Sequence, residues 1–207
     1  MSGFLPTPAQ AEELLLQGEK VHPGPWVDHC RKVGQAAGII AERCPGMDRD
    51  KAVALGMLHD IGRRVGPVDM CHIVEGYRYA MELSMPEVAR ISLTHSFAIK
   101  DTKQSVGNWD CPPEDVQFVQ EYLDSVEYDD YDRLMQLCDY LATPWGFCVL
   151  EKRMVDVTLR RGFNEYTLEK WRWAFKLLAY FEDRMGTALY PLLPGLVDYM
   201  LKGTRKK

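Results

Sequence analysis

Two adjacent ionisable residues, His59 and Asp60, interrupt an apolar stretch that runs from Ala54 to Gly62. The apolar residues predict a buried helix, and burying two ionisable groups costs several kcal/mol unless partners compensate them. Neutral imidazole and carboxylate are also side chains that commonly bind divalent metal ions at neutral pH. The pair therefore indicates either a mutually satisfied structural pair or one part of a metal site.

Other residues of the same types could complete such a site. All five histidines lie in the first half of the chain. His29 falls on the apolar face of a helix expected over about residues 25–43, and Asp139 is a lone carboxylate in the apolar stretch LMQLCDYLATPWG. Ligands from separate helices are typical of metal sites in helical bundles. His29, His59, Asp60 and Asp139 are therefore an ordered candidate ligand set.

This order of residues in a helical chain resembles the HD superfamily of metal-dependent phosphohydrolases. The likeness rests on His29, on the His59-Asp60 pair within the tetrapeptide HDIG at a helix end, and on Asp139. It extends over roughly Trp26 to Thr143. The resemblance implies an all-α bundle of the HD-domain type in which these four residues bind the first metal ion.

The positions of two further histidines extend the resemblance to those members of the superfamily that bind two metals. His72 lies in HIVEGYRYA, thirteen residues after His59, and His95 lies in ARISLTHS. Together with CDYL around Asp139, this order is similar to that of bacterial HD hydrolases that split diadenosine tetraphosphate symmetrically. The resemblance implies that His72 and His95 bind a second metal. It ends at the loop of residues 96–113, so the substrate does not carry over.

The donor set predicts one or two divalent metal ions as cofactors. Nitrogen and oxygen ligands without thiolate favour iron or manganese, and magnesium, nickel, cobalt or zinc would also fit. With two ions, Asp60 would bridge them and a metal-activated hydroxide would attack phosphorus. We therefore expect a phosphohydrolase that cleaves a phosphoester or phosphoanhydride of a nucleotide-like substrate, with Asp60 and Arg63 as catalytic residues.

Basic residues near the motif are candidates for contacts with the substrate. Arg63 and Arg64 could either stabilise a helix C-terminus or present a guanidinium group to a phosphate. Lys100 and Lys103 follow His95 and could line the same opening, although lysines are common on any surface. We predict Arg64, Lys100 and Lys103 as substrate-binding residues.

Two other functions would use the same ligands. The six-residue set also resembles that of HD-fold mixed-valence di-iron oxygenases, such as those that act on myo-inositol or organophosphonates. The pair Arg63-Arg64 favours phosphate chemistry over that alternative. A non-catalytic HD regulatory module is expected to have a broken ligand set, because a fold alone does not guarantee activity. All six positions are occupied by ligand-type residues here.

The remaining pattern predicts a single all-α domain without strands. Capping signals occur at Thr7, at Asp48 and at Ser84-x-x-Glu87, and Gly62 is expected to end the third helix. We divide the chain into an N-terminal helix (1–20), an HD-type metal-binding core (21–145) and C-terminal helices (146–207). Helices are expected at about 8–18, 25–43, 48–61, from 69 onward, 84–95, 113–126, 130–142, 146–160, 166–185 and 188–201.

Composition limits the partners of this 207-residue chain. A net charge of −5 argues against binding to polymeric nucleic acid, since the one basic cluster is the tail of residues 202–207. No apolar run approaches the ~18–20 residues of a membrane span, and six cysteines without a C-x-x-C pair indicate reduced thiols. We expect a cytoplasmic protein that acts on a small phosphorylated substrate, with no membrane partner; its aromatic C-terminal helices could form a homodimer.

Overall fold

The computed structural model describes residues 3–201 and is built almost entirely of helices. The basic tail, residues 202–207, lies outside the described residues. In chain order the elements are α1 (Pro8–Val21), α2 (Trp26–Ala41), α3 (Arg49–Leu58), η1 (Ile61–Val65), α4 (His72–Glu82), α5 (Pro86–Thr94), η2 (Thr102–Gln104), α6 (Pro113–Ser125), α7 (Asp130–Leu141), β1 (Ala142–Thr143), β2 (Gly146–Phe147), α8 (Leu150–Arg161), α9 (Thr167–Met185), η3 (Tyr190–Leu192) and α10 (Leu196–Leu201). The expected all-α fold is confirmed.

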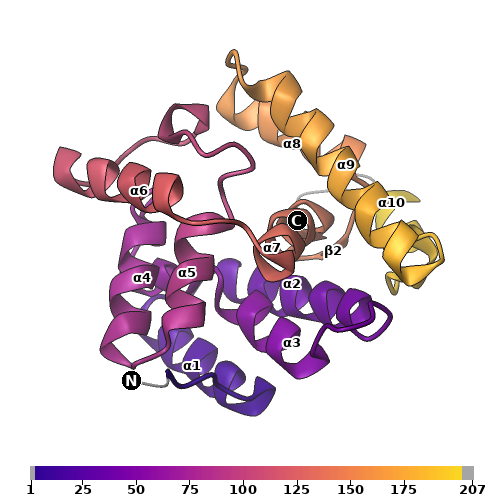
Figure 1. Ribbon diagram of the computed structural model, residues 1–207, viewed down its shortest axis with the longest axis horizontal. Coiled ribbons are helices and arrows are strands. Elements are labelled where there is room, and N and C mark those ends of the chain that lie inside the picture. Colours follow the sequence, from indigo (N-terminus) through magenta and orange to yellow (C-terminus); the bar gives the residue numbers. More distant parts are fainter. Residues whose placement is uncertain (1–2, 202–207) are drawn as a thin grey trace.

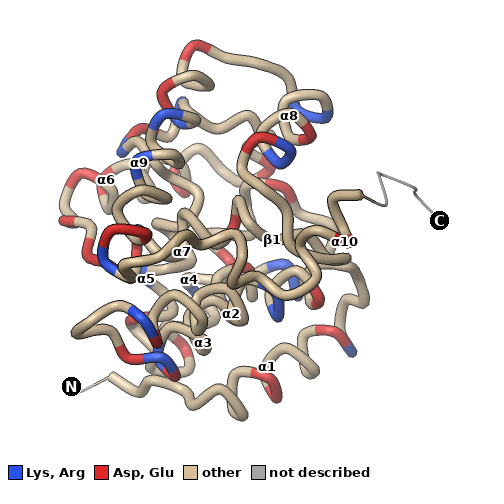
Figure 2. The backbone as a smooth tube through the Cα atoms, turned by 90° about the vertical axis from the view of Figure 1, so that its right-hand side faces the viewer, with Lys and Arg blue, Asp and Glu red and all other residues tan. Residues whose placement is uncertain are grey.

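Helix α7 lies at the centre of the arrangement, between the α4–α5 pair and helices α8 to α10 (Figure 1). Helices α2 and α3 pack against each other, and both contact α7. Helix α5 contacts both α3 and α7. The helices that carry or adjoin the predicted ligands are therefore mutual neighbours. Basic and acidic positions are interspersed along the chain in the side view of Figure 2.

Two predicted helix starts are confirmed, and one is wrong. Thr7 forms the expected capping box with Gln10, and the Asp48 side chain accepts from the backbone N–H of Lys51. Ser84, in contrast, does not cap α5, which begins at Pro86. Instead, Ser84 closes the preceding helix.

The chain reversal after α4 explains that error. Ser84 adopts a left-handed conformation with φ 56°. Its N–H donates to the carbonyl of Met81 at 3.0 Å, and the N–H of Met85 donates to the carbonyl of Ala80 at 2.8 Å. These bonds satisfy the last carbonyls of α4 in the manner of a Schellman motif, which more often uses glycine. A non-glycine residue at this position gives the sequence no recognisable stop signal.

The other differences concern short segments. The region expected to be free of strands contains a hairpin in which Ala142 pairs with Phe147 and Thr143 with Gly146. Two-residue strands are too short to produce an alternating pattern in sequence. The helix predicted over 188–201 is divided into η3 and α10. The prediction that α8 starts at 146 is also wrong, because the hairpin occupies its first residues.

Glycines allow α2 and α3 to approach closely. A Cβ atom on Gly56 would lie 2.7 Å from the Cα and 2.8 Å from the backbone nitrogen of Gly34 on the facing helix. Both distances are shorter than a Cβ atom tolerates, so a side chain at Gly56 would force the backbones apart. The approach places the ring of His29 on α2 5.2 Å, between centroids, from that of His59 at the end of α3.

Gly62 has a role different from the predicted helix stop. Helix α3 already ends at Leu58, and the following 3-10 helix ends at Val65 with Gly66, whose φ is 143°, as its C-cap. A Cβ atom on Gly62 would overlap the carbonyl oxygen of His72. The glycine of the HDIG motif therefore lets η1 pack directly against the first turn of α4, which carries His72.

The core extends across the predicted segments. One cluster of buried apolar side chains includes Leu15 of α1, Leu137 of α7 and Phe181 of α9, and it reaches α10. A smaller cluster around Phe97 joins α4, α5 and α6. The C-terminal helices thus share the main core with the ligand-bearing helices. Among residues 3–201, no helix combines the length and apolar character needed to cross a membrane.

We expect Gly56→Ala to destabilise the protein by about 2 kcal/mol, because overpacking a tight interior contact typically costs 1–3 kcal/mol. Urea unfolding measures the loss. Gly38→Ala is the matched comparison on the same α2–α3 contact: its Cβ would meet side chains rather than backbone, with Cγ2 of Val53 at 2.6 Å and Cγ of Arg49 at 3.9 Å. Equal stability losses in the two variants would contradict the backbone-contact explanation.

Candidate metal centre

The structure brings the six predicted ligands together at one place, where helix ends meet. Three of them lie within helices or at a first turn, and the other three lie at or just beyond helix C-termini. The positions are His29 in α2, His59 at the C-cap of α3, Asp60 between α3 and η1, His72 at the start of α4, His95 at the C-cap of α5, and Asp139 in α7.

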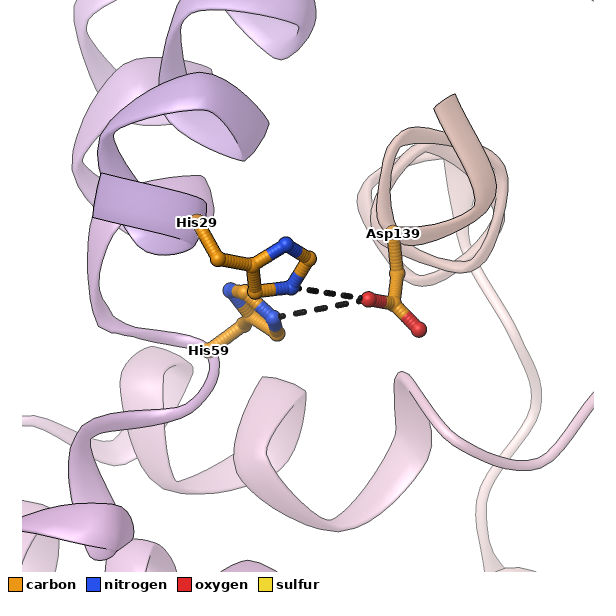
Figure 3. A group of neighbouring side chains, drawn as sticks. All are labelled: His29, His59 and Asp139. Atoms are coloured by element: carbon orange, nitrogen blue, oxygen red, sulfur yellow. Dashed lines mark ion pairs between the residues drawn. The ribbon is translucent and has the colours of Figure 1, made fainter. Parts of the chain in front are cut away.

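Three of these side chains form one end of the site (Figure 3). The Nε2 atom of His29 lies 3.0 Å from Oδ1 of Asp139, and Nε2 of His59 lies 4.0 Å from the same oxygen. Both imidazole rings point toward the carboxylate across the gap between α2 and α7. For metal–ligand bonds of about 2.1 Å, adjacent and opposite ligand atoms are separated by roughly 3–4.2 Å. The observed separations fall within that span.

Asp60 lies at the other end of the site. Its Oδ1 is 2.9 Å from Nε2 of His72 and 3.5 Å from Nε2 of His95, and its Oδ2 is 3.9 Å from Nε2 of His59. His59 lies between the two carboxylates, 3.9 Å from one and 4.0 Å from the other. The six side chains therefore form one continuous cluster rather than two separate groups.

Backbone carbonyls hold three of the imidazole rings in one orientation. Nδ1 of His59 lies 2.7 Å from the carbonyl oxygen of Gly56, and Nδ1 of His95 lies 3.0 Å from that of Ile91. Nδ1 of His72 is hydrogen-bonded to the carbonyl of Asp69. A carbonyl can only accept, so each Nδ1 carries a proton, and a ring that is neutral presents its Nε2 lone pair to the cluster.

This arrangement leaves buried atoms that need a cation. Among the described residues, the buried side-chain atoms without a hydrogen-bond partner include Nε2 of His59, Nε2 of His72 and Oδ1 of Asp60. The last two face each other at 2.9 Å. A lone pair and a carboxylate oxygen repel each other at that distance unless a positive charge lies between them. The donor set therefore fits divalent metal ions.

Protonation would satisfy these histidines poorly. Burial lowers the pKa of His59 to about 3, although Asp60 opposes the shift. Burial and the charge of Arg63 lower the pKa of His72. Burial also lowers the pKa of His95, but the contact with Asp60 outweighs it and leaves that pKa raised. At neutral pH two of the three rings are therefore neutral and free to act as metal ligands.

Both carboxylates are ionised. Burial raises the pKa of Asp60, but Arg63 and His72 outweigh burial and hold it well below its ordinary value. Burial also raises the pKa of Asp139, but the contact with His29 outweighs burial and leaves that pKa lowered. Two carboxylates with oriented imidazole nitrogens form a ligand set of the kind that binds divalent metal ions.

Of the four predicted phosphate-contacting side chains, Arg63 touches the cluster. Its Nε donates to Oδ2 of Asp60 at 2.5 Å, and its Nη1 donates to the carbonyl of Val68 at 3.2 Å. The guanidinium of Arg64 instead lies over the ring of Tyr79, 4.2 Å from its centroid.

The two predicted lysines lie on the segment between α5 and α6. Lys100 donates to the carbonyl of Val126 and lies 3.3 Å from Oε1 of Glu127. Lys103 is exposed on η2. Neither lysine has a contact with the six ligands among the interactions of the described residues.

Arg153 is a residue near the site that the sequence did not reveal. Its charge contributes to lowering the pKa of Asp139. Its side chain is 19% exposed and forms only a loose ion pair, 3.8 Å long, with Asp156. Helix α8 carries many charged residues, so the sequence contained no signal that singled out this one.

A family model for the HD domain matches residues 26–143, more than half of the chain. This protein therefore belongs to the HD-domain family, whose members bind divalent metals and are typically metal-dependent phosphohydrolases. No curated protein and no solved structure matches the chain. The matched range begins with the helix of His29 and ends four residues after Asp139, so it includes all six side chains of the cluster.

We expect His59→Ala and Asp60→Ala each to remove bound metal. His59 faces both ends of the cluster, and Asp60 supplies the carboxylate that the two ends share. Elemental analysis of protein purified with Mn²⁺ measures the metal content. His22→Ala is the matched control, since this histidine is the C-cap of α1 and belongs to neither of the possible metal-holding groups among the described residues. Full metal content in both cluster variants would contradict the assignment.

Proposed function

We propose that this protein is a phosphohydrolase that uses two divalent metal ions to cleave a phosphoester or phosphoanhydride of a nucleotide-like substrate. The observation that carries the proposal is the facing pair of buried atoms without a hydrogen-bond partner, Nε2 of His72 and Oδ1 of Asp60, next to an arginine. His29, His59 and Asp139 would hold one ion, and His72 and His95 the other. Asp60 would contact both.

We propose iron or manganese as the metal, because the ligands are imidazole and carboxylate without a thiolate. When bound, the ions would lower the pKa of a water molecule toward neutrality and polarise the phosphoryl group. The protein supplies the orientation of the donors. The carbonyl bonds fix three rings before any ion or substrate arrives, so little reorganisation accompanies binding.

The burial pattern supports substrate entry beside Asp139. The side chains of His59, His95 and His72 are 0%, 2% and 3% exposed, whereas that of Asp139 is 32% exposed. Arg63 is 29% exposed on the same cluster. Solvent therefore reaches the cluster at Asp139 and Arg63, whereas His59, His72 and His95 are closed off from it.

Arg63 is the side chain that we propose to bind the phosphoryl oxygens. Its Nε and Nη1 have protein partners, which anchor the planar group beside Asp60. The hydrogen bonds of the described residues leave Nη2 without an acceptor, so it is available as a donor. A guanidinium fixed in this way can stabilise negative charge that develops on a phosphoryl group. Arg64, Lys100 and Lys103 stay weaker proposals for substrate contacts.

The first test is hydrolysis by protein that is depleted of metal and then reloaded with Mn²⁺ or Fe²⁺ under anaerobic conditions. We expect phosphate release from at least one member of a panel of phosphomonoesters, phosphodiesters, nucleotides and dinucleoside polyphosphates. Anaerobic turnover would exclude the oxygenase alternative for that reaction. Oxygen consumption without any hydrolysis would contradict our proposal, and so would a protein that binds metal but releases no phosphate.

We expect Arg63→Ala to lower kcat/KM by about 100-fold, the usual effect of removing one fixed donor to a developing oxyanion. Steady-state kinetics on the best substrate, together with metal content, measures the effect. Arg49→Ala is the control, because Arg49 is exposed and its ion pair among residues 3–201 is with its neighbour Asp50. Unchanged kinetics in the metal-loaded Arg63 variant would exclude the phosphate-binding role.

A further inference from the structure

The acceptor for His72 differs from those of the other oriented histidines. His59 and His95 bond to carbonyls three and four residues earlier, at Gly56 and Ile91 within their own helices. Those carbonyls are held by the helices themselves. The acceptor for His72 is the carbonyl of Asp69, which precedes α4 and lies in no helix. Another part of the protein must hold this carbonyl in place.

The side chain of Asp110 supplies that support. Its Oδ2 accepts from the backbone N–H of Asp69 at 2.6 Å, and its Oδ1 accepts from the backbone N–H of Cys71 at 2.8 Å. The two bonds enclose Met70 and fix the turn that carries the Asp69 carbonyl. Cys71, the N-cap of α4, provides no side-chain cap of its own. The carboxylate of Asp110 therefore acts at the start of α4 from a distant part of the sequence.

A second carboxylate strengthens the same turn. Oδ2 of Asp69 accepts from the backbone N–H of Asn108 at 2.8 Å and from Nη1 of Arg161 at 2.7 Å. The N–H of Met70 donates to the carbonyl of Asn108 at 3.1 Å. The two segments thus exchange hydrogen bonds in both directions, and α8 adds one more through Arg161.

Asp110 is ionised in this arrangement. Partial burial raises its pKa, but the N–H donors of Asp69 and Cys71 outweigh that effect and leave the pKa lowered. A carboxylate has two acceptor oxygens and no proton to donate, so it can accept from both N–H groups at once. An amide in its place would present a donor to one of them. The chemistry of the position therefore favours aspartate.

We propose that Asp110 is a positioning residue for the metal ligand His72, so that the segment of residues 96–112 is a working part of the metal centre. The proposal deepens the two-metal function above and depends on it. By fixing the Asp69 carbonyl, Asp110 keeps the proton of His72 on Nδ1 and directs Nε2 toward Asp60. Loss of such support for a metal-bound histidine typically lowers metal affinity 10–100-fold.

The test is a titration of metal-free Asp110→Ala with Mn²⁺, in which calorimetry measures the affinities and electron paramagnetic resonance detects whether the bound ions are coupled. We expect one ion to bind as in the wild type and the other to bind about 10–100-fold more weakly. The resonance signal of a coupled manganese pair should give way to that of an isolated ion. His72→Ala sets the full extent of the loss. Asp110→Asn, which keeps one acceptor oxygen, should lie between Asp110→Ala and the wild type.

Asp101→Ala is the matched control for general damage to the segment. Its carboxylate also accepts from a backbone N–H, that of Lys103 at 2.8 Å, and it also bonds toward the C-terminal helices, through the hydroxyl of Tyr166 at 2.8 Å. It does not contact the turn before His72. We expect this variant to bind both ions with wild-type affinity, even where its melting temperature falls.

The outcomes separate the two proposals. Wild-type protein that binds fewer than two ions contradicts the two-metal function and, with it, this inference. Wild-type protein that binds two ions, combined with unchanged affinities in Asp110→Ala, contradicts the positioning role alone. Equal weakening of both ions, or the same loss in Asp101→Ala, also contradicts it. If Asp110→Ala does not fold, the comparison of Asp110→Asn with the wild type decides.

Discussion

The central constraint on this structure is the repulsion among the buried donor atoms of the cluster, which the protein's own side chains relieve only in part. Nε2 of His72 and Oδ1 of Asp60 lie 2.9 Å apart in a closed interior, and a second carboxylate, Asp139, lies at the other side of His59. Arg63 neutralises part of this charge, but it contacts only Oδ2 of Asp60. A buried group of donors without a cation between them is unfavourable, so the fold is organised around a place for positive charge.

Close helix packing brings the candidate ligand atoms of the cluster near one another. Gly34 and Gly56 bring α2 and α3 together, and Gly62 brings η1 against α4. Each contact moves one ligand toward the others: His29 toward His59 in the first case, and His72 toward Asp60 in the second. The glycines lie outside the ligand set, yet they determine whether nitrogens and oxygens from five elements come within metal-binding distance. Two of these glycines, Gly56 and Gly62, lie within a few residues of the His59-Asp60 pair, so that short stretch contributes to both the packing and the chemistry.

The sequence predicted which side chains gather in the cluster better than it predicted their surroundings, for a physical reason. A histidine or aspartate inside an apolar helix is conspicuous, because burial without a partner is costly. That signal identified His29, the His59-Asp60 pair and Asp139. The roles of Ser84 and Gly62 depend on contacts made after folding, with the end of α4 and with His72, so local pattern misassigned both. Lys100 illustrates the same limit, since a long side chain can reach many partners and here reaches Val126.

The support for the histidines also divides the centre into two unequal halves. His59 and His95 are oriented by carbonyls of the helices that carry them, so their positions follow from helix formation itself. His72 is oriented by a turn whose geometry is held by residues 69, 108, 110 and 161. A ligand held through tertiary contacts responds to changes in those contacts, whereas one held within its own helix does not. The orientation of His72 is therefore the part of the centre that the loop sequence and the packing of α8 can change.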